Sequence, residues 1–154
     1  MVPDFDLAFH GGEPLLLFRL FLATLVGGMI GWNRFRAGKP AGVGTYALVA
    51  LGAAFFVAIP ILTNSLDALS RVIQGITAGI GFLGAGEIFR DRGERRVRGL
   101  TSAAALWATA ALGIIAVCGS VALVAAATLI VLLVLVIAPR CERRFPPRVD
   151  NSPY

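Results

Sequence analysis

The sequence has few of the residues from which enzymes and metalloproteins build their sites. It contains one histidine, and its two cysteines, Cys118 and Cys141, form no CxxC motif. Because a structural zinc site takes four Cys or His ligands, no zinc site is expected. There is also no HExxH motif, no serine–histidine–aspartate set and no carboxylate pair inside an apolar segment. We therefore expect no enzymatic activity and no cofactor, with Mg²⁺ considered only as a transported or sensed ion.

A phosphate loop is missing as well. The segment GKPAG at residues 38–42 resembles one superficially, because a lysine follows a glycine. A P-loop requires GxxxxGK[ST] between a strand and a helix, whereas here Pro40 follows Lys39. ATP hydrolysis is therefore not expected.

Apolar residues, in contrast, are abundant and come in long segments. They make up 57% of the chain, above the roughly 45–50% that is usual for soluble domains. The apolar segments are residues 14–32, 41–62, 72–89, 100–117 and 120–138. Because roughly 20 apolar residues span the hydrocarbon core of a bilayer, the sequence predicts an all-α integral membrane protein, a bundle of five transmembrane helices.

The ends of the chain are polar. No basic residue lies in residues 1–13, so the first apolar segment is expected to be a retained helix rather than a cleaved signal peptide. The tail after Pro139 is basic and rich in proline, which is typical of disorder. We therefore divide the chain into an extracytoplasmic segment (1–13), a transmembrane domain (14–139) and a short cytoplasmic tail (140–154).

Basic residues alternate between the two sides of the predicted membrane. Residues 33–40, 90–99 and 140–154 hold three, five and four of them, which is twelve of the fourteen in the chain. The positive-inside rule then predicts an outside N-terminus and a cytoplasmic C-terminus. Because these residues lie in short loops rather than along one helical face, the sequence pI of about 10.2 does not indicate a nucleic-acid partner.

Glycines indicate how the helices pack. In the first helix Ala23, Gly27 and Gly31 form a small-xxx-small stripe, which allows close backbone approach in lipid. The third helix has small residues on two faces, so we place it at the centre of the bundle. Its packing glycines are Gly75, Gly79, Gly81, Gly84 and Gly86. The alternative is a broken or re-entrant segment at residues 79–86, GIGFLGAG, which requires cover from protein or water.

Ionisable side chains within membrane spans are rare and are functional candidates by default. At the outer side, Arg19 either extends to the lipid headgroups or pairs with Asp67. Asp67 and Arg71 are spaced i, i+4 at the start of the third helix, where a simple ion pair would stabilise the helix. Gln74 continues this polar line inward.

A second set of polar residues lies at the predicted cytoplasmic side. Glu87 precedes the Arg-rich loop, where an ion pair with Arg90 or Arg98 is the plain explanation. Thr101 and Ser102 open the fourth helix, either as N-caps or as a hydroxyl pair facing a cytoplasmic cavity. We group the inner polar residues into one candidate site: Arg34, Lys39, Glu87, Arg98 and Thr101.

Three stretches of the sequence resemble a known family. They are GWNRFRAGKPAGVGTYALVALGAAFF, RVIQGITAGIGFLGAG and VRGLTSAAALWATAALG, and they look like the membrane domain of the MgtC/SapB family over roughly residues 15–138. The resemblance matches Arg34, the KPAG of residues 39–42, Asp67, Arg71, Gln74 and the RGLT of residues 98–101 to family positions. The chain departs from the family pattern at Phe35, where Glu is usual, and at Gly44 and Tyr46, where Arg and His are common.

The resemblance also implies a function. Members are linked to growth in low magnesium, survival inside macrophages and acid resistance, and they resemble regulators of other membrane complexes, including ATP synthase. Many carry a cytoplasmic ACT-like domain that is not expected here. We therefore expect a non-enzymatic regulator that contacts membrane lipids, another inner-membrane complex and possible further copies of itself in a homo-oligomer. The alternative is an oligomeric transporter or channel for Mg²⁺ or another ion, with an anionic solute left open.

Overall fold

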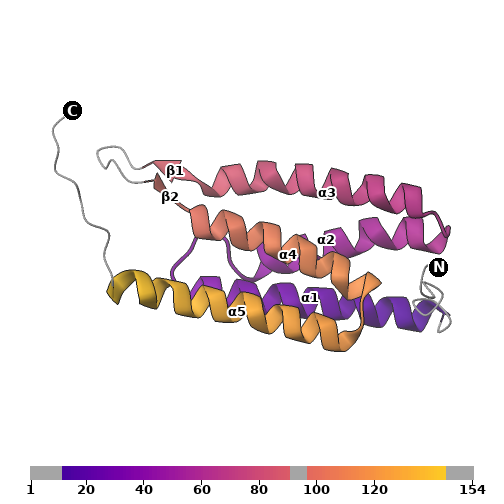
Figure 1. Ribbon diagram of the computed structural model, residues 1–154, viewed down its shortest axis with the longest axis horizontal. Coiled ribbons are helices and arrows are strands. Elements are labelled where there is room, and N and C mark those ends of the chain that lie inside the picture. The colour runs from indigo at the N-terminus through magenta and orange to yellow at the C-terminus, as the bar shows by residue number, and fades with distance from the viewer. Residues whose placement is uncertain (1–11, 91–96, 145–154) are drawn as a thin grey trace.

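The computed structural model describes residues 12–90 and 97–144, and over these ranges the chain forms five long helices joined by short connections (Figure 1). All five are long and apolar enough to cross a membrane, so the predicted five-helix membrane bundle is confirmed. The helices are α1 (Gly12–Arg36), α2 (Val43–Leu62), α3 (Leu66–Glu87), α4 (Leu100–Cys118) and α5 (Val121–Arg144). Between α3 and α4, β1 (Phe89–Arg90) pairs antiparallel with β2 (Val97–Arg98), with Phe89 opposite Arg98.

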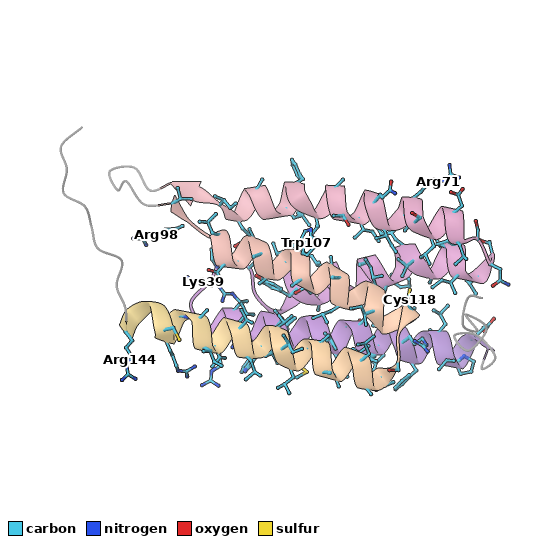
Figure 2. The ribbon with its side chains drawn as sticks, in the orientation of Figure 1. Lys39, Arg71, Arg98, Trp107, Cys118 and Arg144 are labelled. Carbon is cyan, nitrogen blue, oxygen red and sulfur yellow. The ribbon has the colours of Figure 1, made fainter. Side chains whose placement is uncertain are left out.

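The short connections place basic residues at one end of the bundle. Here α1, α3 and α5 end while α2 and α4 begin, and we call this the basic end (Figure 1). Figure 2 shows Lys39, Arg98 and Arg144 at this end, with Arg71 and Cys118 toward the other, which we call the opposite end. The side of the membrane that each end faces stays a prediction.

The core of the bundle lies between α1, α2 and α4, where the backbones come close. A β-carbon on Gly31 of α1 would lie 2.6 Å from the Val43 Cα of α2, and one on Gly27 would collide with the Tyr46 carbonyl. On α4, a β-carbon on Gly113 would lie 2.9 Å from the carbonyl carbon of Ala50. In lipid, such close approach supplies much of the attraction between helices.

The position of α3 differs from the sequence-based expectation. The transmembrane window of α4 is 50% buried inside the bundle and that of α2 is 44% buried, but the window of α3 is only 17% buried. Space is open at Gly75, Gly79, Gly81 and Gly86, and only Gly84 of the five α3 glycines meets a neighbour, Ala103. The two most buried helices, α2 and α4, therefore form the centre of the bundle. The prediction for α3 was wrong because glycine permits close packing without requiring it. Residues 79–86 are continuous helix, not a re-entrant segment.

Two helix boundaries also differ from expectation. Helix α3 begins at Leu66, where the Ser65 side chain accepts a hydrogen bond from the Ala68 N–H at 3.2 Å. Helix α5 continues through Pro139 to Arg144, so residues 140–144 of the expected tail are helical. Prolines are tolerated in membrane helices when neighbouring groups satisfy the freed backbone. The expected segments 1–11 and 145–154 lie outside the described residues.

Candidate functional site

Three helices contribute buried polar side chains to one cluster near the basic end. Arg34 of α1 donates from Nη2 to the Ser102 Oγ of α4 at 3.1 Å, and the Tyr46 hydroxyl of α2 donates to the Ser102 carbonyl at 3.1 Å. Arg34 is 2% exposed, Ser102 is 1% exposed and Tyr46 is fully buried. We call these three residues, together with Glu87 of α3, the Arg34 cluster.

The Arg34 cluster is charged but incompletely paired. Arg34 Nε and Glu87 Oε2 are buried without a hydrogen-bond partner, although both side chains act electrostatically on the Tyr46 hydroxyl. Among the described residues, no carboxylate lies within 4 Å of the Arg34 guanidinium. Burying a charge without direct pairing costs several kcal/mol, by order of magnitude. The cluster therefore holds a guanidinium and a carboxylate, without direct contact between them, beneath the first turns of α2 and α4.

The other members of the predicted inner site lie at the surface. Lys39, Arg98 and Thr101 are exposed at the basic end, and Figure 2 shows Lys39 and Arg98 there. The structure thus brings Arg34 and Glu87 to the same buried tyrosine, whereas the other three residues are exposed. Neither Thr101 nor Ser102 caps α4, because its N-cap is Gly99 with no side-chain hydrogen bond.

Tyr46 and Ser102 are not among the site residues that the sequence predicts. For Ser102 the sequence predicts only a role beside Thr101, as a cap or as part of a cavity. Tyr46 carries a signal that identifies such residues, because a tyrosine in an otherwise apolar helix needs a partner for its hydroxyl when it is buried. That partner is the Ser102 carbonyl.

The helices that begin at the basic end have uncapped N-termini. The N-caps are Gly42 for α2 and Gly99 for α4, and glycine has no side chain that could accept a hydrogen bond from the first N–H groups. In α2 the first N–H with a helical acceptor is that of Tyr46, which donates to the Gly42 carbonyl at 3.2 Å. Free N–H groups and the helix dipole make such an end attractive to anions.

At the opposite end, Arg19 has a role that neither sequence-based alternative described. Its Nη1 donates to the carbonyls of Ala116, Val117 and Gly119 at 3.1, 2.7 and 2.8 Å. These carbonyls belong to the last turn of α4 and its C-cap, where the helix supplies no further N–H donors to them. Arg19 therefore caps α4 from α1, rather than extending to headgroups or pairing with Asp67.

The three polar residues at the start of α3 form local contacts. Asp67 and Arg71 make an i, i+4 ion pair with both side chains about three-quarters exposed, at 75% and 73%. Gln74 Nε2 lies 3.5 Å from the Ser70 Oγ, also on the surface. The structure thus matches the simple reading of Asp67 and Arg71 as a pair at a helix start.

One face of α3 carries small and polar side chains with no neighbour from the bundle. Residues at helical spacing form this α3 outer face, and all are exposed: Ser70, Gln74, Thr77, Ala78, Gly81 and Ala85. Thr77 uses its hydroxyl on the Ile73 carbonyl of its own helix, at 2.8 Å. The face is unusual for lipid contact, because lipid-facing surfaces are normally apolar.

A groove of about 720 Å³ lies between α2 and α3, on a different face of α3. We call it the α2–α3 groove. It is lined almost entirely by apolar residues: Thr45, Leu48, Val49, Gly52, Ala53 and Phe56 of α2, Val72, Gly75, Ile76, Gly79, Ile80 and Leu83 of α3, and Ala110 of α4. Within residues 12–90 and 97–144, no three His, Cys, Asp or Glu side chains come together as metal ligands would.

The fold and these sites define a small multi-pass membrane protein with the buried Arg34 cluster at one end. A sequence model of the MgtC family matches residues 20–144. The chain therefore belongs to the MgtC family.

Several relatives have been named. Protein SrpB of Synechococcus elongatus is 50% identical, over 60% of this chain and 57% of its own length. Protein MgtC of Salmonella typhimurium is 44% identical over 62% of this chain and 42% of its own, and protein MgtC of Brucella abortus is 47% identical over 55% and 35%. The chain thus spans between about a third and somewhat over half of these relatives. No solved structure matches it.

Proposed function

We propose that this protein is a non-enzymatic regulator in the bacterial inner membrane. It acts by contact with another membrane protein complex under magnesium limitation or acid stress, with ATP synthase as one candidate partner. The α3 outer face is the contact surface. Membership of the MgtC family supports the link to magnesium, and the contact mechanism is argued from α3.

The observation that carries the proposal is the mismatch between the polarity of α3 and its burial. Helix α3 is the least apolar of the five, yet its transmembrane window is no more buried than that of α5. Gln74 lies seven residues beyond Asp67, which places it about 10 Å further along the helix axis. An amide at such depth loses about 2–7 kcal/mol without compensating hydrogen bonds. A partner helix on this face would supply them.

Small residues on the same face favour a helix as the partner. Ala78, Gly81 and Ala85 let another backbone approach closely, and nothing lies within 4 Å of a β-carbon built on Gly81. Close approach and interhelical hydrogen bonds are the main sources of helix association in lipid. The α3 outer face offers both.

The alternative is an ion transporter or channel built as an oligomer. If copies associated around α3, then Ser70, Gln74 and Thr77 would face a shared axis and supply oxygen ligands. Mg²⁺ prefers octahedral oxygen coordination and retains several waters, and hydroxyl and amide oxygens suit a hydrated ion. The exposure of these three polar side chains on one face of α3 is the observation that favours transport.

Site-specific photocrosslinking in cells tests the contact. A photoreactive residue replaces Ala78 on the α3 outer face or, as the control, Ile130 on the exposed side of α5. We expect one protein adduct from position 78, identified by mass spectrometry, and none from position 130. Gly81→Leu should remove the adduct and also fail to restore growth of a deletion strain in low magnesium. Lipid adducts alone at position 78 would contradict the proposal.

A flux assay separates regulation from transport. The purified protein is reconstituted in liposomes containing a Mg²⁺ indicator, beside protein-free liposomes and a Gln74→Leu variant. A regulator gives the same background flux in all three samples. Flux above background that Gln74→Leu abolishes would replace the regulator by the transporter.

A further inference from the structure

We propose that the α2–α3 groove binds an acyl chain of an anionic phospholipid whose phosphate lies at the N-terminus of α2. This site is separate from the α3 outer face and does not depend on whether the protein regulates or transports. The inference rests on the length of the groove, its open glycines and the positive charge at one of its ends.

The length of the groove fits a lipid in one leaflet. Its lining runs from residue 45 to 56 on α2 and from 72 to 83 on α3, which corresponds to about 16 Å at 1.5 Å per residue. The hydrocarbon core of a bilayer is about 30 Å thick, so the groove covers about half of it. A transmembrane helix would need the whole thickness, whereas an acyl chain occupies one leaflet.

The shape of the groove follows from the packing of α3. Helices α2 and α3 meet at the connection of residues 63–65 and separate toward the basic end (Figure 1). Near that end α3 leans on α4, through Gly84 and Ala103. Gly52 of α2 and Gly79 of α3 face open space, so the groove keeps room for an alkyl chain where larger side chains would fill it.

The positive charge at the basic end is complementary to a phosphate group. Thr45, the groove residue nearest this end on α2, lies in the first turn of the helix, whose N-cap Gly42 has no side-chain cap. Free N–H groups there favour an anion. Lys39 is exposed in the preceding loop, and the buried Arg34 guanidinium, whose Nε has no hydrogen-bond partner, lies behind this turn. Together these groups favour an anionic headgroup over a zwitterionic one.

Native mass spectrometry of the detergent-purified protein tests the site. The protein is incubated with an equimolar mixture of phosphatidylglycerol and phosphatidylcholine that have identical acyl chains. We expect the wild type to retain phosphatidylglycerol in preference to phosphatidylcholine. Filling the groove with Gly79→Leu or Gly52→Leu should weaken phosphatidylglycerol binding about tenfold, which is one decade in Kd.

Matched variants separate the groove and the headgroup from general effects. Gly81→Leu lies on the other face of α3 with equally open space, and it should bind lipid as the wild type does. Lys39→Gln should reduce the preference for phosphatidylglycerol, whereas Arg71→Gln at the opposite end should not. Circular dichroism and elution volume establish whether each variant is folded. Because the two groove variants lie on different helices, one of them is enough to test the groove if the other does not fold.

Three results would overturn the inference. Unchanged phosphatidylglycerol binding by a folded groove variant would remove the groove from the site. Equal binding of the two lipids by the wild type would remove the headgroup preference. Displacement of the lipid by millimolar inorganic phosphate or glycerol phosphate would show that the phosphate alone is recognised, without the acyl chain.

Discussion

Replacing Gly113 by alanine should separate the two most buried helices. A β-carbon at this position would lie 2.9 Å from the carbonyl carbon and 3.0 Å from the Cα of Ala50. Carbon atoms attract each other best at about 3.5–4.0 Å, so these two contacts alone require α2 and α4 to move apart by roughly 0.5–1 Å, and the Ala50 carbonyl oxygen lies closer still. Such a gap removes about a quarter to a half of the attraction in each affected contact.

The magnitude follows from two opposing effects. Overpacking a close contact costs about 1–3 kcal/mol, whereas alanine in a helix interior is more favourable than glycine by about 1 kcal/mol. We expect the packing effect to prevail, because the atoms next to Gly113 are backbone atoms that cannot rotate away. The free energy of unfolding should therefore fall by up to about 2 kcal/mol, the difference between the two effects.

Equilibrium unfolding in mixed micelles with increasing sodium dodecyl sulfate, followed by far-ultraviolet circular dichroism, measures this change. Gly52→Ala is the matched control, because it lies in the middle of α2 and no atom is within 4 Å of its β-carbon position. It should leave the free energy of unfolding unchanged or raise it by up to about 1 kcal/mol. If Gly113→Ala were as stable as Gly52→Ala, the close packing of α2 on α4 would be refuted.

Further predictions concern the charged residues and the orientation. Arg19→Met removes the donors from the last carbonyls of α4 and should lower the free energy of unfolding by about 1–2 kcal/mol in the same assay. Arg34→Gln removes a buried charge-assisted donor and should cost about 1–3 kcal/mol, whereas Asp67→Asn, which breaks an exposed ion pair, should change stability by less than about 0.5 kcal/mol. The orientation can be tested in intact cells with two variants that each carry a single cysteine, Ser120→Cys or the native Cys141. An impermeant maleimide should modify the cysteine at position 120, but it should reach Cys141 only after permeabilisation. The reverse pattern would contradict the predicted orientation.

The five spans were predictable because bilayer thickness sets the length of an apolar segment. The place of each helix in the bundle was harder to predict. The glycines of α1 and α3 look alike in the sequence, yet Gly27 and Gly31 meet α2 while Gly75 and Gly79 face open space. Spacing shows where a neighbour can approach, but which neighbour arrives depends on all five helices together. Gly113 is the single glycine in the interior of α4.

The polar contacts were hard to predict for a different reason. The sequence offers Asp67 as a partner for Arg19, because both are charged and lie toward the same end. The acceptors are instead the main-chain carbonyls of Ala116, Val117 and Gly119, and every residue has a carbonyl. Arg34 and Ser102 are 68 positions apart, so their contact depends on the packing of α1 against α4.

The β1–β2 hairpin has a consequence for how the α2–α3 groove can bind. Gly99, at φ +93°, packs so closely on the Glu87 carbonyl that any side chain there would collide with it. At its other end α3 is joined to α2 by a three-residue connection through Asn64, at φ +50°. Because both ends of α3 are held, we expect the width of the groove to change little when a ligand binds. Preorganisation of this kind lowers the entropic cost of binding, so the proposed site should distinguish acyl chains by their shape.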